Sequence, residues 1–190
     1  MKKSLEGREK EILRKKEGEE KEILRRSRVP TPAGAVVLVE RDGALVGLVF
    51  EDHWKGFRRD LERRFGTLTF EENLQTESAA AALHRYLAGD LAAIESIAVD
   101  TGGTEFQQLV WTTLRRIPAG TTWSYARLAK EIGKPSATRA VAAANGANPV
   151  SIVIPCHRVI GADGSLTGFG GGLHVKRFLL EHEGALLPLG

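Results

Sequence analysis

A short apolar run that leads into the only cysteine constrains the fold of this chain most. Residues 150–154 read Val-Ser-Ile-Val-Ile, and this β-branched composition predicts a strand that is buried on both faces. Pro155 lacks the amide hydrogen that a neighbouring strand would need, so we expect the strand to end there and the chain to turn. In a continuing strand, Cys156 and His157 would point to opposite faces. Both side chains can serve one pocket only if a bend or a helical turn follows Pro155.

The cysteine itself has two interpretations. A lone thiol often serves as a small buried apolar group. It becomes a nucleophile only as the thiolate, and an ordinary cysteine has a pKa of ~8.5, so activation requires a base, a cation or a helix N-terminus nearby. His157 and Arg158 follow directly and are the candidate activating groups.

The length of 190 residues and the 42% hydrophobic content allow one large or two small domains. No apolar run approaches the ~20 residues that span a bilayer, and the N-terminus is charged rather than signal-like, so we expect a soluble, cytoplasmic protein. We also expect a monomer. One cysteine excludes an internal disulfide and a thiolate-rich zinc site. The five histidines show no metal-ligand spacing with it, and neither a metal nor a cofactor is expected.

Residues 1–28 differ in composition from the rest of the chain. Residues 6–16 are nearly repeated by residues 17–27, a period of eleven that fits three helical turns. Each repeat contributes a single Ile-Leu pair, which is too little apolar surface to fix a helix to a core. We therefore predict a charged tail that is helical or disordered, and an engineered origin also fits its repetition.

Residues 29–100 predict a small α/β domain with a supporting role. Two apolar runs within residues 35–50 flank Asp42-Gly43, a dipeptide that favours the tight turn of a β-hairpin. Apolar residues recur at intervals of three and four over residues 54–65, and residues 78–87 carry a second helical pattern.

Residues 101–190 form the predicted second domain, and residues 99–103 link it to the first. This domain holds nine Lys and Arg residues against five Asp and Glu residues. The excess of positive charge indicates a polyanionic partner, although an ordinary solvated surface would also account for it.

Two short helical patterns in the second domain have the spacing of a helix-turn-helix. Residues 125–132 end at Gly133, and a second helix begins near Pro135 and runs to about residue 146. Small side chains occupy the start of this second helix around one long cation, Arg139; they are Ser136, Ala137, Thr138 and Ala140. Small side chains allow close approach to a narrow groove, which indicates minor-groove binding with little sequence preference. The alternative is that these alanines pack inside the domain.

A glutamate near the end of the chain is predicted to be partly buried. Glu183 lies three and four residues after Leu180 and Leu179 on a predicted helix over residues 173–183, so it shares their apolar face. A buried carboxylate needs a partner that neutralises or hydrogen-bonds it.

The order Pro-Cys-His-Arg-Val over residues 155–159 is similar to the signature of the O6-alkylguanine-DNA alkyltransferases, and residues 104–187 resemble that family nearly end to end. Residues 106–111 match the opening motif of its catalytic domain. The resemblance implies an α+β protein, in which a small RNase H-like α/β domain precedes a mainly helical catalytic domain with a helix-turn-helix. It implies irreversible, single-turnover transfer of an alkyl group from O6 of guanine in double-stranded DNA to Cys156. Some members carry a zinc ion in the N-terminal domain, and this chain lacks the cysteines for it.

The resemblance also implies roles for individual residues. His157 would deprotonate Cys156 through a water, and Glu183 would orient His157. Tyr125 falls at the position of a tyrosine that hydrogen-bonds the guanine and helps to rotate it. Arg139 falls at the position of an arginine that fills the gap left by the flipped nucleotide. Asn148, just before a proline, matches a hinge asparagine that pins the helix-turn-helix to the cysteine segment.

The substrate pocket implied by the resemblance includes Val159 and a glycine-rich loop, with Phe169, Gly170 and Gly171. The backbone N–H at Gly170 would face the guanine oxygen. Members often have tyrosine at the position of Phe169, and some have serine at that of Gly170, so the pocket shape and the substrate range of this chain are open questions.

Two other functions fit the same residues. A hydrolase would use Cys156 and His157 with repeated turnover, but the sequence offers no separate oxyanion motif. A protein that only binds alkylated DNA, or regulates through it, would not need the thiol.

Overall fold

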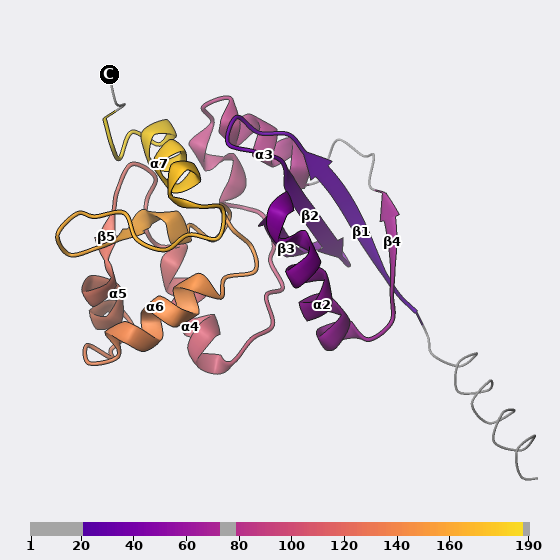
Figure 1. Cartoon of the computed structure of the whole chain (residues 1–190), viewed down its shortest axis with the longest axis horizontal. Helices are drawn as coiled ribbons and strands as arrows, with labels where there is room; N and C mark the ends of the chain where they lie inside the picture. Colours follow the sequence, from indigo (N-terminus) through magenta and orange to yellow (C-terminus); the bar gives the residue numbers. More distant parts are fainter. Residues whose placement is uncertain (1–20, 73–78, 188–190) are drawn as a thin grey trace, which may run out of the picture.

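The computed structural model describes residues 21–72 and 79–187 of the chain. A small sheet with two helices lies on one side of the molecule, and the remaining helices lie on the other (Figure 1). The fold is therefore a mixed α and β fold, as predicted. We refer to residues 21–72 and 79–100 as the N-terminal region and to residues 101–187 as the C-terminal region.

The sheet of the N-terminal region has the strand order β3-β2-β1-β4. Its strands are β1 (Glu22–Val29), β2 (Val36–Arg41), β3 (Ala44–Phe50) and β4 (Leu68–Glu72). β1 pairs antiparallel with β2 and parallel with β4, and β2 pairs antiparallel with β3. Asp42 and Gly43 form the turn between β2 and β3 with φ of +48° and +79°, which Asp-Gly tolerates well. The predicted hairpin is confirmed.

The prediction of a helical or disordered tail is wrong for residues 22–28, because these residues form most of the interior strand β1. Only Leu24 and Val29 of this strand are buried. Its charged side chains find partners on neighbouring elements, since Glu22 accepts from Arg41 at 2.6 Å and Arg28 pairs with Glu51 at 2.8 Å. The strand is held by pairing with distant segments, which local composition does not reveal. The rest of the predicted tail, residues 1–20, lies outside the described residues.

Helices cover both faces of the sheet. α2 (Trp54–Phe65), which matches the apolar spacing predicted over residues 54–65, packs Phe57 and Leu61 against one face and ends at Gly66. α3 (Ala79–Leu87) places Leu83 and Tyr86 in the larger core on the opposite face. This core continues into the C-terminal region, so the two regions share one apolar interior. The first residue of the helix predicted over 78–87 lies outside the described residues.

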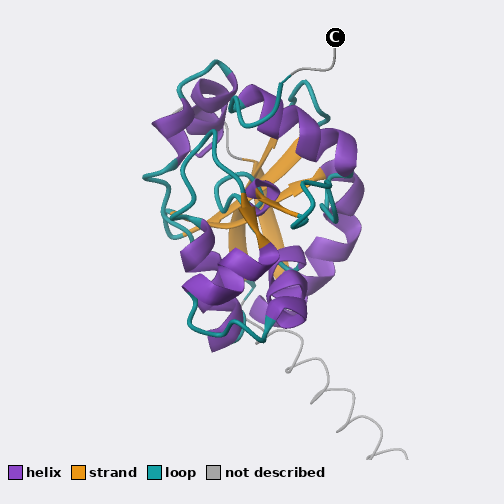
Figure 2. Ribbon diagram, turned by 90° about the vertical axis from the view of Figure 1, so that its left-hand side faces the viewer, coloured by secondary structure: helices purple, strands orange, loops and turns teal. Residues whose placement is uncertain are grey.

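The C-terminal region contains α4 (Glu105–Leu114), α5 (Tyr125–Glu131), α6 (Thr138–Gly146) and α7 (Leu173–His182). Figure 2 views the molecule from this side, with the strands seen between helices in that projection. Two-residue strands, β5 (Trp123–Ser124) and β6 (Val159–Ile160), pair in parallel. Short 3-10 helices occur at η1 (Glu51–His53), η2 (Leu91–Ile94) and η3 (Cys156–Arg158).

The helix ends follow from local chemistry. Thr104 caps α4 in a capping box with Gln107, and Ser124 caps α5 through the amide of Arg127. The indole of Trp111 donates to the carbonyl of Ala144 at 2.8 Å and thereby ties α4 to α6. α4 ends at Leu114, and Arg115 is its C-cap residue.

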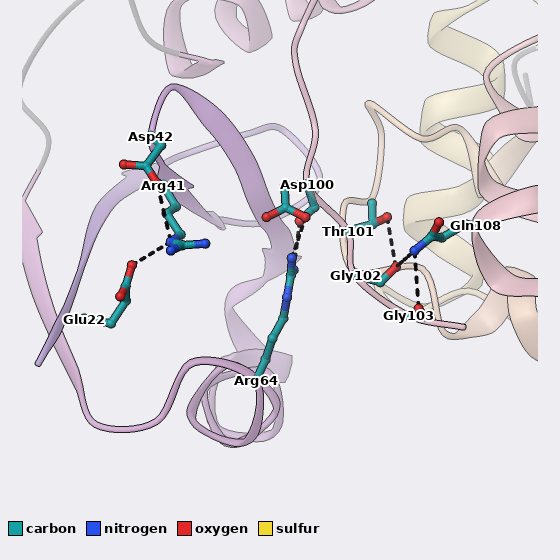
Figure 3. A network of polar contacts seen from close by, with 9 residues as sticks. All are labelled: Glu22, Arg41, Asp42, Arg64, Asp100, Thr101, Gly102, Gly103 and Gln108. Atoms are coloured by element: carbon teal, nitrogen blue, oxygen red, sulfur yellow. Dashed lines mark hydrogen bonds and ion pairs between the residues drawn. The ribbon is translucent and has the colours of Figure 1, made fainter. Parts of the chain in front are cut away.

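The segment that connects the two regions is fixed at both ends (Figure 3). Arg64 of α2 binds the carbonyl oxygen of Asp100 at 2.9 Å and also its carboxylate. On the other side, the amide of Gln108 donates to the carbonyl oxygen of Gly102 at 3.2 Å. Across the described residues, no helix has the length and apolarity that crossing a bilayer requires.

Candidate active site

The segment before Cys156 is buried as predicted, but it is not a strand. Its backbone pairs with β3 at an isolated bridge, in which the Leu48 amide donates to Pro149 O and the Leu48 carbonyl accepts from the Ser151 amide, at 2.9 Å each. The chain then reverses direction at Ile152, whose φ is +71°. The amide of Val153 donates to Ser151 O at 2.9 Å and closes this turn. Positive φ is strained for a β-branched residue. The apolar composition of residues 150–154 therefore predicted their burial correctly, but not their backbone conformation, which is a series of tight turns.

Asn148 closes this loop. Its side-chain amide donates to the carbonyl of Ile154 at 2.8 Å, and its side-chain oxygen accepts from the amide of Val150 at 3.0 Å. One side chain thus satisfies both ends of the segment, which explains why the backbone does not need a strand partner. The structure brings the end of α6 and the cysteine segment together at Asn148.

A helical turn after Pro155 brings three polar side chains to the same interior. Pro155 has φ −80° and ψ 63°, the conformation of an inverse γ-turn, and the Cys156 amide donates to Ile154 O at 2.8 Å. The 3-10 turn η3 follows, and Cys156, His157 and Arg158 are 5%, 0% and 6% exposed. The predicted turn is confirmed.

The carboxylate of Glu183, just after α7, lies at the centre of a buried network. Its Oε1 accepts from His157 Nε2 at 2.9 Å, from Arg158 Nη2 at 2.8 Å and from the Tyr86 hydroxyl at 2.7 Å. Its Oε2 accepts from Arg158 Nε at 2.8 Å, and Arg158 Nη1 donates to Ile117 O. The prediction that Glu183 is buried beside His157 is confirmed. Arg158, a candidate for activating the thiol, instead binds this carboxylate.

The electrostatics of the network fix the charge of its members. Burial alone would raise the pKa of Glu183, but the hydrogen bonds from His157 and Arg158 outweigh it and hold that pKa well below its usual range. Burial lowers the pKa of His157 more than Glu183 raises it, so the imidazole is neutral near pH 7. Its Nε2 then carries the proton toward Glu183. The buried Nδ1 has no hydrogen-bond partner among the described residues, and its lone pair is free to accept a proton.

The thiol lies between opposing effects. Burial raises the pKa of Cys156, whereas hydrogen bonding from Asn148 and the charge of Lys176 act to lower it. Lys176 is fully buried on α7 and donates to Val159 O at 2.6 Å and to Thr167 O at 2.7 Å. Burial lowers its pKa to about 8, against the attraction of Cys156. Sequence reasoning missed Lys176, although it shares the helical face of Leu179 and Leu180.

The glycine-rich loop packs against β3. The Phe169 ring lies edge-on to Phe50 at 5.9 Å and to His157 at 6.4 Å between centroids. A Cβ at Gly171 would lie 2.7 Å from the Phe50 ring, so only glycine fits there, whereas Gly170 has open space. Val159 is fully buried in β6. Of the predicted pocket residues, Phe169 meets the ring of His157, and Val159 accepts a hydrogen bond from Lys176.

The predicted DNA-contacting residues lie around the start of α6. Arg139 and Ala140 are exposed on the helix, and Thr138 is partly buried. Ser136 is exposed and Ala137 partly buried in the preceding turn. Tyr125 is partly buried at the first position of α5.

Several known proteins are similar to this chain in both sequence and fold. Residues 105–185 match the family described as 6-O-methylguanine DNA methyltransferase, DNA binding domain. A methylated-DNA–protein-cysteine methyltransferase of Shigella flexneri is 41% identical over 163 residues, which cover 84% of this chain and 95% of that protein. A crystal structure of Mycobacterium tuberculosis O6-methylguanine methyltransferase has a TM-score of 0.72 and 38% identity, and the match covers 88% of this chain and 96% of that one.

A crystal structure of Mycobacterium tuberculosis OGT in complex with DNA has a TM-score of 0.71 and 40% identity, and the match covers 85% of this chain and 93% of that one. These similarities span both regions of the molecule, including the N-terminal sheet. They confirm the resemblance that residues 104–187 indicate, and this chain belongs to the methylated-DNA–protein-cysteine methyltransferase family.

Proposed function

We propose that this protein repairs DNA by transferring an alkyl group from O6 of guanine to the sulfur of Cys156. The observation that carries the proposal is that the buried turn with Cys156 also holds His157, whose Nε2 is hydrogen-bonded to Glu183. A nucleophile, a base and a residue that orients the base are the parts that an activated thiol requires.

In the proposed first step, His157 Nδ1 takes the thiol proton through a water. Glu183 holds the Nε2–H of the same ring, which leaves Nδ1 unprotonated before the reaction and stabilises the imidazolium after it. The positive charge of Lys176 favours the thiolate that forms. This arrangement offsets the cost of ionising a buried sulfur.

In the second step, the thiolate attacks the alkyl carbon in line with its bond to O6. A carbon–sulfur bond forms, the carbon–oxygen bond breaks, and the electron pair stays on the guanine. A proton or hydrogen bond is needed as that charge develops, and Tyr125 is the proposed donor. The proton that His157 takes from the thiol equals the one that the guanine gains with Tyr125 restored, so the transfer consumes no cofactor. The thioether is not readily hydrolysed, so each molecule reacts once.

The guanine reaches the thiol only outside the duplex, because Cys156 is 5% exposed and a stacked, paired base cannot enter the protein interior. We propose that α5 and α6 act as a helix-turn-helix on the minor groove, with Arg139 inserted where the base has left. The small residues Ser136, Ala137, Thr138 and Ala140 allow the helix to approach the groove closely. Exposed Arg127, Lys130 and Lys134 on the same two-helix unit add charge for the phosphates.

The extruded base is proposed to bind between Val159 and the loop that holds Phe169. The amide of Gly170 would donate to the guanine oxygen, and Gly171 would keep the loop seated on Phe50. We further propose that the N-terminal region is an RNase H-like supporting domain, that residues 101–190 form the catalytic domain, and that the protein acts as a cytoplasmic monomer.

The test uses duplex DNA that contains one O6-methylguanine, followed by mass spectrometry of the intact protein. Transfer predicts one stable methyl adduct per molecule, located on Cys156, and none on the Cys156→Ser variant. A hydrolase would consume substrate repeatedly and remain unmodified, and a lesion-binding protein would shift the DNA without any chemistry. Either of these last two results would overturn the proposal.

A further inference from the structure

Glu183 has a hydrogen-bond donor that comes from the N-terminal region. Tyr86 lies on α3, which packs on the sheet, and it is fully buried. Its hydroxyl donates to Glu183 Oε1 at 2.7 Å across a separation of 97 residues in sequence. No other side-chain hydrogen bond in the described residues links the N-terminal region to the carboxylate.

Tyr86, His157 and Arg158 share one oxygen atom of that carboxylate. His157 Nε2 is 2.9 Å and Arg158 Nη2 is 2.8 Å from the same Oε1. Each donor polarises the negative charge of the oxygen toward itself. The hydrogen bonds that the same oxygen accepts from the other donors become weaker. The effect is large in a buried site, where neither water nor mobile ions screen it.

The position of Tyr86 is fixed by α7 as well as by α3. His182 Nε2 lies 2.8 Å from the Tyr86 carbonyl oxygen, and the two rings meet edge-on at 5.0 Å between centroids. Burial and the neighbouring carboxylate raise the pKa of Tyr86 well above its usual range, so its hydroxyl stays protonated near neutral pH and donates to Glu183.

The N-terminal region also holds the cysteine segment from its other side. The backbone of Leu48 in β3 bonds Pro149 O and the amide of Ser151. The sheet thus fixes the loop that precedes Cys156, and α3 fixes the carboxylate behind His157. These two contacts connect the N-terminal region to the reacting groups of the C-terminal region.

We propose that Tyr86 is a positioning residue for the alkyl transfer, which fixes Glu183 and limits the negative charge that this carboxylate presents to His157. Through Tyr86, the N-terminal region sets the pH range in which the Cys156–His157 pair reacts. The kinetic part of this inference rests on the proposed function.

The first test is Tyr86→Phe, which removes only the hydroxyl. With one donor fewer, Oε1 attracts the His157 proton more strongly, so the imidazole becomes more basic and a higher pH is needed to keep it unprotonated. We expect the acid limb of the single-turnover rate to move up by about half a pH unit. The rate at neutral pH should fall about three- to tenfold as the carboxylate loses its fixed position. The affinity for unmodified duplex DNA should not change, because Tyr86 is buried away from α6.

Thr113→Val is the matched control. Thr113 is also buried, and its hydroxyl donates only to the carbonyl of Leu109 at 2.8 Å. This variant should lose a comparable amount of stability without moving the acid limb. An equal shift of the limb in both variants would mean that the effect is a general loss of packing, and the proposal would be wrong.

A second variant strengthens the donor instead of removing it. Difluorotyrosine placed at position 86 keeps the shape of the ring and acidifies the phenol, so the acid limb should move to lower pH. This variant decides the question should Tyr86→Phe fail to fold. A pH profile that stays unchanged in the difluorotyrosine protein would overturn the inference.

A readout in the free protein separates this inference from the proposed function. The NMR resonance of the His157 Nε2–H proton should move downfield in Tyr86→Phe, because the remaining bond to Glu183 strengthens. Absence of alkyl transfer by the unaltered protein would refute the function alone. An unmoved resonance would refute the role of Tyr86, whatever the unaltered protein does with DNA.

Discussion

At the residue scale, the site depends on buried ionisable groups whose pKa values differ from those of the same groups in water. Glu183 is 5% exposed and yet ionised, because donors surround both of its oxygens. His157 is neutral because burial disfavours its cation. Such groups bind protons differently in the folded and unfolded chains, so they make stability depend on pH.

The first prediction concerns acid stability. The folded pKa of His157 lies below its unfolded value near ~6.5, and that of Glu183 lies below ~4.3, so the unfolded chain binds more protons at acid pH. The free energy of unfolding should therefore fall as the pH drops below about 6.5, by up to about 1.4 kcal/mol per pH unit for each proton. Glu183 adds to the loss below about pH 4.3.

Urea unfolding at a series of pH values measures this dependence. The slope between pH 6.5 and 5 should be smaller in His157→Gln than in the unaltered protein. His84→Gln, at an exposed position of α3, serves as the control and should leave the slope unchanged. Parallel curves for all three proteins would contradict the prediction.

At the scale of elements, the glycine-rich loop and β3 form one packed unit. Phe50 is 7% exposed and is contacted by Phe169, and the backbone at Gly171 approaches it too closely for a side chain. The same strand bonds the cysteine segment through Leu48. β3 therefore aligns the loop and the nucleophile with each other.

The second prediction follows from this contact. Gly171→Ala should destabilise the protein by about 1–3 kcal/mol, because the Phe50 ring is confined in the core and cannot move aside freely. It should also slow alkyl transfer by displacing the loop. Gly170→Ala is the matched control for stability, since its new Cβ meets no atom of the protein within 4 Å. Denaturant melts and single-turnover rates check both effects, and equal behaviour of the two variants would contradict the assignment.

At the scale of the whole molecule, the nucleophile lies where the two regions meet. Cys156 belongs to the large core that joins α3 and the sheet to α4, α6 and α7. Cys156 is 5% exposed, so a group that stays on its sulfur must be accommodated among neighbouring core residues. We therefore expect alkylation of Cys156 to change the free energy of unfolding of the whole protein.

The third prediction is that alkylation lowers the stability of the folded protein. A methyl group on Cys156 should cost about 1–3 kcal/mol by overpacking, and a larger group should cost more. Thermal unfolding of the protein before and after reaction measures the change. Cys156→Ala exposed to the same DNA should show no shift, and an unchanged melting temperature of the alkylated protein would contradict the prediction.

The sequence by itself determined the local features of this protein. Asp42-Gly43 specified the hairpin turn, Gly66 ended α2, and the signature around Cys156 indicated the family, because each depends on neighbouring residues alone. Tertiary structure decided what depends on distant partners. Residues 22–28 became a strand through pairing with β2 and β4, and the run before Cys156 became tight turns because Asn148 satisfies its backbone. Tyr86 reached Glu183 only through folding, since no local pattern encodes a hydrogen bond between residues so far apart in the chain.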